Sequence, residues 1–204
     1  MPLFWLTVGL TLALLARILG NRVLYLLPWL ALTAVLAHNG AFSNFQRLPP
    51  TLLLFVFTAV AAATFLSFRT SAPLPWLIGF QAFRIPVELF LHQGYLAGFV
   101  PVQMTWEGRN FDVLTGLSAL PLAWLAHRGQ LPSWAAHTWN LAGFALLINI
   151  MSVAILSFPT PFRQFLNDPP NVFVTTVPYV WLPVFLVPAA WFGHAAVFRH
   201  LKKN

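Results

Sequence analysis

Long apolar runs separated by short polar segments dominate the pattern of the chain. The runs are continuous rather than alternating, which favours helices over membrane β-strands. A helix needs about 20 apolar residues to cross the hydrocarbon core of a bilayer. We therefore predict an all-α, polytopic transmembrane bundle of about seven helices in a single domain, 1–204. The predicted helices are Leu3–Ala16, Val23–Ala37, Thr51–Ser67, Pro75–Phe99, Phe111–Ala126, Ser133–Phe158 and Val177–Phe198.

The first two predicted helices are short and are separated only by a turn around Gly20 and Asn21. They form either a tight hairpin or a pair in which the first helix lies partly in the membrane interface. The segment Pro159–Thr176 also has two interpretations. It contains a short interfacial helix from Pro161 to Asn167, or it is a proline-rich connector.

The composition agrees with a membrane protein. Hydrophobic residues make up 59% of the chain and charged residues only 7%, whereas soluble domains carry about 25% charged residues. An ordinary cytosolic enzyme, a disordered region and a secreted disulfide module are therefore excluded. The chain has no cysteine, which excludes disulfides, thiolate metal sites and cysteine nucleophiles.

The basic residues indicate an orientation. With the N-terminus outside, the inner loops and the tail hold seven of them and the outer loops only three, the bias of cytoplasmic loops. We therefore predict an N-out, C-in topology, and the net charge of +7 needs no nucleic-acid partner. The inner set is Arg17, Arg22, Arg69, Arg128, Arg199, Lys202 and Lys203; the outer set is Arg47, Arg109 and Arg163.

The fourth predicted helix carries a polar stripe. Gln81, Arg84, Glu88, His92 and Tyr95 follow one another at spacings of three or four residues, so they share one helix face. A charge at the bilayer centre costs at least about 2.5–3.5 kcal/mol. The four-residue spacing lets Arg84 pair with Glu88. The stripe must also face other helices or a water-filled cavity. A purely structural ion pair is the alternative to a functional site.

A second polar cluster precedes the fifth predicted helix. It consists of Glu107, Arg109, Asn110 and Asp112. In one interpretation, Asn110 caps the helix and the charges form a local ion pair. In the other, Glu107 and Asp112 fold inward over the fourth helix and form a carboxylate–imidazole cluster with Glu88 and His92.

Such a cluster could transfer protons or hold zinc. No H-E-x-x-H motif is present, so no metal site is predicted. The candidate ligands, if zinc binds, are His92, Glu88, Glu107 and Asp112.

Both lysines lie in the tail, which excludes a retinal Schiff base. His92 and His194 differ in depth by roughly 20 Å, which argues against a haem between them. The cofactor is therefore left unknown. Asn140 and Asn149 are expected to form hydrogen bonds across helices.

Four runs resemble a family of small bacterial multi-pass inner-membrane proteins without an assigned function. They are FQAFRIPVELFLH (Phe80–His92), MTWEGRNFDVLTG (Met104–Gly116), SFPTPF (Ser157–Phe162) and PYVWLPVFLVP (Pro178–Pro188). The resemblance implies a location in the bacterial inner (cell) membrane and implies no reaction.

Three functions are compatible with these features. The first is a transporter-like protein that binds an ion or a small molecule in a cavity open to the outer face. The second is a membrane-embedded enzyme that acts on a lipid or isoprenoid at the outer leaflet. The third is a non-catalytic membrane subunit. Membrane lipid is an expected partner in each case. The residues of the predicted binding site or proton pathway are Gln81, Arg84, Glu88, His92, Glu107, Arg109, Asn110 and Asp112.

Overall fold

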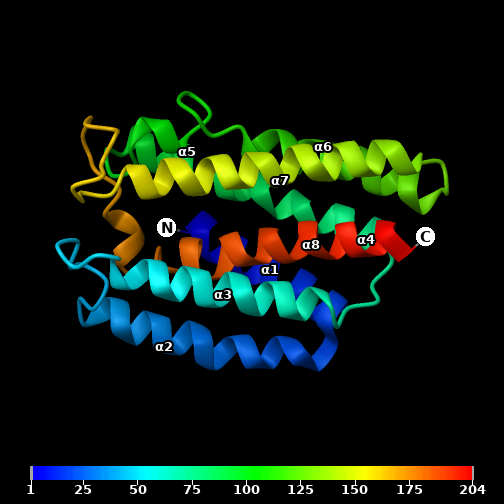
Figure 1. Cartoon of the computed structure of the whole chain (residues 1–204), viewed down its shortest axis with the longest axis horizontal. Helices are drawn as coiled ribbons and strands as arrows, with labels where there is room; N and C mark the ends of the chain where they lie inside the picture. The colour runs from blue at the N-terminus through cyan, green and yellow to red at the C-terminus, as the bar shows by residue number, and fades with distance from the viewer. Residues whose placement is uncertain (1, 204) are drawn as a thin grey trace.

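The computed structural model describes residues 2–203, which form helices and loops without a β-strand. The helices run along the long axis of the molecule (Figure 1). In chain order the elements are α1 (Pro2–Leu19), η1 (Gly20–Tyr25), α2 (Leu26–His38), α3 (Thr51–Ser67), α4 (Leu74–Phe80), η2 (Gln81–Phe83), α5 (Arg84–Leu96), η3 (Val102–Met104), α6 (Asp112–His127), α7 (Ser133–Leu156), η4 (Phe173–Thr175), η5 (Leu182–Leu186) and α8 (Val187–Lys203).

The prediction of seven helices is wrong by one. Among residues 2–203, six long helical segments are separated by non-helical loops. The difference arises because the expected turn around Gly20 is itself a 3-10 helix, η1, that joins α1 to α2 without a break. Gly20 has a positive φ of 61°, which glycine adopts without steric cost. The chain therefore reverses direction at η1, as Figure 1 shows.

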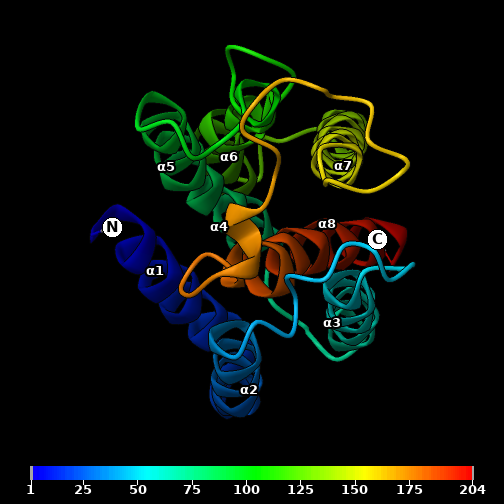
Figure 2. The same ribbon diagram turned by 90° about the vertical axis from the view of Figure 1, so that its left-hand side faces the viewer.

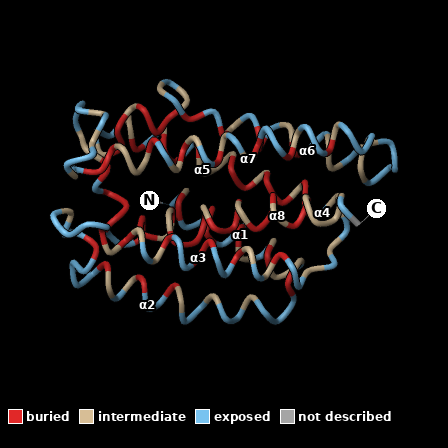
Figure 3. The backbone as a smooth tube through the Cα atoms, in the orientation of Figure 1, coloured by how far each residue is buried: buried red, intermediate tan, exposed pale blue. Residues whose placement is uncertain are grey.

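Four helical segments are long and apolar enough to cross a membrane, judged by length and composition. They are Pro2–His38, Leu74–Leu96, Ser133–Leu156 and Leu182–Lys202. Helix α3 is apolar but shorter. Many large apolar side chains are exposed, and Leu6, Tyr25 and Trp134 are more than 65% exposed. Exposed residues lie mainly on the outer faces of the helices (Figure 3), which suits surroundings of lipid rather than water.

Helix α8 is the central element of the bundle. It packs against α3, α4 and α7, and Figure 2 shows it between α3 and α7. The indole of Trp29 in α2 donates to the backbone oxygen of Val184 at 3.0 Å. Pro188 lies four residues after Val184 and has no N–H to donate to that oxygen. The indole therefore supplies a donor that the helix backbone lacks.

The connection between α7 and η5 contains no α-helix. Residues 161–167 form turns and coil, so the connector interpretation of Pro159–Thr176 is confirmed, with one 3-10 turn at η4. The loop between α5 and α6 folds back into the protein, because Val100, Thr105 and Asn110 are completely buried. This loop determines where α6 begins.

Candidate functional site

A band of buried polar side chains crosses the middle of the bundle. Each of them is at most 6% exposed, and they come from four helices. Arg84 is the eleventh of the 23 residues of Leu74–Leu96, so it lies near the middle of that segment. The members are Arg84 and Glu88 of α5, Asp112 of α6, Asn140 of α7 and His194 of α8.

Arg84 pairs with Asp112 rather than with Glu88. Its Nε donates to Asp112 Oδ2 at 3.1 Å, and its Nη2 donates to the same oxygen. No ion pair joins Arg84 to Glu88 in the described part of the chain. The pairing expected along one helix is therefore replaced by a pairing between two helices, because α6 packs against both α5 and η2.

The third guanidinium nitrogen of Arg84 contacts His194. Arg84 Nη1 lies 3.0 Å from His194 Nε2 and donates more weakly to Gly143 O at 3.4 Å. On the other side of the ring, His194 Nδ1 lies 2.8 Å from Asn140 Oδ1. Asn140 Nδ2 in turn donates to the backbone oxygen of His194 at 3.1 Å. These bonds confirm that Asn140 forms hydrogen bonds across helices.

The contacts determine the tautomer of His194. Because Asn140 Nδ2 donates to a carbonyl, Asn140 Oδ1 is the atom that faces the ring. This oxygen only accepts, so His194 Nδ1 carries a proton. A guanidinium only donates, so His194 Nε2 carries a lone pair. His194 is therefore neutral and adds no charge to the band.

Glu88 is bound by Asn110. Asn110 Nδ2 donates to Glu88 Oε1 at 2.6 Å and to Met104 O at 3.0 Å. Asn110 Oδ1 accepts from the backbone N–H of Asp112 at 3.1 Å. Asn110 thus satisfies a free N–H at the start of α6, as expected of a capping residue, although the residue directly before the helix is Phe111. It also holds Glu88 beside Asp112.

Helix α6 begins in the middle of the bundle, because its first residue, Asp112, contacts Arg84. With 16 residues, it spans roughly 24 Å, less than the roughly 30 Å of a hydrocarbon core. Two further irregularities occur in helical segments that contribute residues to the site. The segment Leu74–Leu96 contains the 3-10 turn η2, and η5 is a π-helical turn with Pro183 in it. Interrupted helices around a polar site are typical of transporters.

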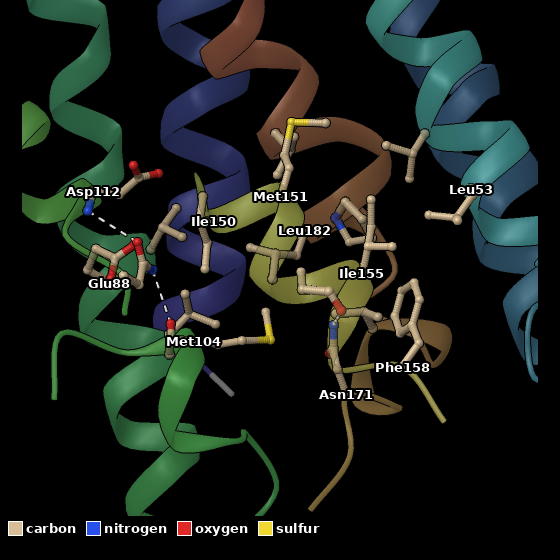
Figure 4. A pocket seen from close by; sticks show the side chains of 18 residues that line it. Leu53, Glu88, Met104, Asp112, Ile150, Met151, Ile155, Phe158, Asn171 and Leu182 are labelled. Atoms are coloured by element: carbon tan, nitrogen blue, oxygen red, sulfur yellow. Dashed lines mark hydrogen bonds between the residues drawn. The ribbon is translucent and has the colours of Figure 1, made fainter. Parts of the chain in front are cut away.

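A cavity of about 90 Å³ adjoins Glu88 and Asp112. Figure 4 shows both carboxyl groups at one end of it, with the side chains of Leu53 and Phe158 at the other. The lining is mostly apolar. Three lining residues nevertheless carry a buried oxygen that finds no hydrogen-bond partner within residues 2–203: Glu88 Oε2, Asp112 Oδ1 and Asn171 Oδ1. An ionised carboxylate and an amide oxygen only accept hydrogen bonds, so the cavity presents acceptors to whatever occupies it.

The other predicted site residues lie apart from this cavity. His92 stacks on Trp106 with ring centroids 4.3 Å apart, and its Nδ1 lies 3.5 Å from Glu107 Oε1. Arg109 lies over the ring of Phe165, and its backbone oxygen accepts from Asn149.

Gln81 is buried in the bundle, where its Nε2 donates to Ala190 O at 3.0 Å. The eight predicted residues therefore divide into a buried set of Gln81, Arg84, Glu88, Asn110 and Asp112 and a loop-side set of His92, Glu107 and Arg109.

The candidate zinc ligands are divided between these two sets. Glu88 and Asp112 adjoin the cavity, and His92 and Glu107 form the loop-side pair. Within residues 2–203, no group of three or more His, Asp or Glu side chains is arranged to hold a metal ion. The carboxylate–imidazole cluster expected over the outer end of α5 is therefore not formed in this range.

Three members of the site lie outside the predicted set of site residues: Asn140, His194 and Asn171. Asn140 was expected only to form hydrogen bonds across helices. His194 lies about 110 residues after Arg84 in the sequence, and only the packing of α8 against α7 and α4 brings it to the guanidinium. Asn171 lies in the connector Pro159–Thr176, where no site residue is predicted. One signal was available for His194, because an ionisable residue in the middle of an apolar segment is a candidate functional residue by default.

The comparisons with known proteins identify a family but no function. No curated protein and no solved structure matches the chain. A family model described as a domain of unknown function, DUF8737, matches residues 46–202. The match contains every residue of the polar band and omits α1, η1 and α2. The chain therefore belongs to the DUF8737 family.

Proposed function

We propose that this chain is a transporter-like membrane protein that binds a small cation, or a proton, between Glu88 and Asp112. The observation that carries the proposal is an imbalance of charge in the buried band. One guanidinium, that of Arg84, faces two carboxyl groups, and Asp112 occupies two of its donors. His194 is neutral, so it does not compensate the second carboxyl group.

Glu88 therefore requires a positive partner. Its Oε1 accepts from a neutral amide, and its Oε2, buried beside the cavity, has no hydrogen-bond partner among the residues that the structure describes. A buried carboxylate without a counter-charge costs several kcal/mol. A proton or a cation in the cavity removes this cost. With either occupant, Glu88 would be the group that binds and releases it.

The interrupted helices support movement of the occupant as well as binding. In transporters, discontinuous helices place their ends at mid-membrane binding sites. Here α6 begins at Asp112, η2 interrupts a segment that packs against α6, and η5 lies in the segment that contributes Leu182 and Pro183 to the cavity. Such irregular backbone is tolerated at membrane depth where it is enclosed by protein or lines a cavity.

The proposal includes a location. We place the chain in the bacterial inner membrane, with its N-terminus outside. The support for this orientation is the excess of basic residues on the side that holds Arg17, Arg69 and Arg199. In this orientation, the cavity lies in the outer half of the bundle, below the connector that carries Asn171.

A flux assay tests the function. The purified chain is reconstituted in liposomes that contain a pH-sensitive dye, and sodium, potassium or methylammonium chloride is added outside. We expect at least one cation to change the internal pH through the protein, and Glu88→Gln to abolish the response. Asp168→Asn is the matched control, because its side chain is 90% exposed in a loop; it should retain the response. Folded protein without any response, or an active Glu88→Gln variant, would contradict the proposal.

A further inference from the structure

The cavity extends from the two carboxyl groups toward the gap between α3 and α7. Its far walls are formed by Leu53 and Val56 of α3 and by Met151, Ala154 and Ile155 of α7. Figure 4 shows the side chains of Leu53 and Ile155 across the cavity from Glu88. Both walls belong to helices that are separated by α8 rather than packed together.

The arrangement of the helices opens this end of the cavity sideways. Helices α3 and α7 each pack closely on α8, and Figure 2 shows them on opposite sides of it. Leu53, Ala154 and Ile155 are partly exposed, whereas Glu88 and Asp112 are buried. The cavity therefore reaches the surface between α3 and α7, along the side of the bundle that faces acyl chains.

The polarity of the cavity changes along its length. The far end is lined mainly by apolar side chains, with the amide of Asn171 among them, and the two carboxyl groups lie at depth. A bare inorganic ion entering from the side would lose its water shell against the apolar walls before it reached a carboxylate. A molecule with an apolar body and a polar head matches both ends.

The polar end specifies the chemistry of the head group. The unpartnered oxygens at this end, Glu88 Oε2 and Asp112 Oδ1, are hydrogen-bond acceptors, so the head must donate. The charge imbalance also calls for one positive charge. A primary ammonium group satisfies both requirements, because it has three N–H donors and one positive charge.

We infer that the cavity binds a lipophilic primary ammonium compound that enters from the membrane between α3 and α7. The inference rests on the proposed function, because it assigns a substrate class to the same site. The ammonium group lies between Glu88 and Asp112, and the apolar body lies along Leu53 and Ile155.

Thermal unfolding of the full chain in detergent micelles tests the inference through tryptophan fluorescence. The probes are methylammonium, hexylammonium and hexanol at equal concentrations. We expect hexylammonium to raise the Tm more than methylammonium does, because its chain adds apolar contact, and we expect no rise with hexanol. Glu88→Gln should weaken the apparent affinity for hexylammonium by about tenfold or more, equivalent to a loss of about 1.4 kcal/mol or more.

A variant at the opening tests the route. Ala154→Phe fills the gap on α7, so it should reduce the response to hexylammonium and retain the response to methylammonium. Ala145→Phe makes the same change at an exposed position of α7 outside the cavity lining, and it should retain both responses. Binding of hexylammonium that is unaffected by Ala154→Phe would overturn the lateral route.

The probes separate failure of this inference from failure of the proposed function. If methylammonium stabilises the protein and hexylammonium does so no better, the site binds small cations and the lipophilic substrate class is wrong. If hexanol acts as well as hexylammonium, the head group is recognised as a hydroxyl donor and the ammonium assignment is wrong. If neither ammonium compound shifts the Tm and the liposome assay shows no flux, both proposals are wrong.

Discussion

Arg84 donates from Nη1 to Nε2 of His194 at 3.0 Å, although both groups are basic. The contact is favourable only with a neutral imidazole whose lone pair faces the guanidinium. Asn140 selects this tautomer by accepting from Nδ1. The guanidinium is thus enclosed by one carboxylate, one imidazole and one backbone carbonyl, and the neutral imidazole does not repel it.

Removal of Asn140 tests this arrangement. In Asn140→Leu, the His194 Nδ1–H loses its acceptor in a buried site. An unsatisfied buried donor costs about 1–3 kcal/mol, so we expect a loss of stability of that size, measured by thermal or denaturant unfolding in detergent. Asn149→Leu is the control from the same helix, because Asn149 bonds to Arg109 O at a more exposed site. Equal effects of the two substitutions would contradict the special role of Asn140.

Neutralising substitutions of the two carboxyl groups should have different effects on the stability of the protein. Asp112→Asn removes the only anion that pairs with Arg84 in the described part of the chain and leaves a buried charge, so we expect a loss of about 3–5 kcal/mol. Glu88→Gln removes a carboxyl group that has no cationic partner among residues 2–203, so it should leave stability unchanged or raise it. Unfolding midpoints of the two variants, compared with Asp168→Asn, check the prediction. A larger loss for Glu88→Gln than for Asp112→Asn would show that the charges are paired differently.

Gly143 allows α7 to approach α8 closely. A Cβ at this position would lie 2.7 Å from His194 Cε1 and 2.8 Å from Thr115 Cγ2. Gly143→Ala should therefore displace His194 from Arg84 and cost about 1–3 kcal/mol of stability. Gly9→Ala is the matched control, because a Cβ there would meet nothing within 4 Å. A Gly143→Ala variant as stable as Gly9→Ala would show that the helices can separate at little cost.

The effects of substitutions at Trp29 and Pro188 on the free energy of unfolding should be coupled. Trp29→Phe removes the indole donor to Val184 O, and we expect it to cost about 1 kcal/mol. In a Pro188→Ala background, the new backbone N–H can donate to Val184 O, so the same substitution should cost less. A double-mutant cycle of unfolding free energies measures the difference. Additive effects would mean that the stabilising effect of the Trp29 indole does not depend on the missing backbone N–H of Pro188.

The pH dependence of cation binding follows from the competition between protons and cations for Glu88. A cation binds only to the ionised carboxylate, so affinity should fall as the pH falls and rise as the pH rises. The charged groups around Glu88 are Arg84 on its own helix and Asp112 on α6, while His194 on α8 stays neutral. Titration of methylammonium at several pH values measures the effect. In His92→Ala the pH profile should be unchanged, because His92 stacks on Trp106 outside the cavity lining.

The sequence by itself determined what depends on short-range spacing and hydrophobicity. The apolar runs located the helices, and the spacing of Arg84 and Glu88 placed both on one face that cannot turn toward lipid. Tertiary structure decided the partners. Arg84 pairs with Asp112 because the buried loop before α6 starts that helix at mid-depth, and His194 arrives from a helix far along the chain. Helical periodicity defines which residues share a face, but it carries no information on the course of a loop or on which helices meet across the bundle.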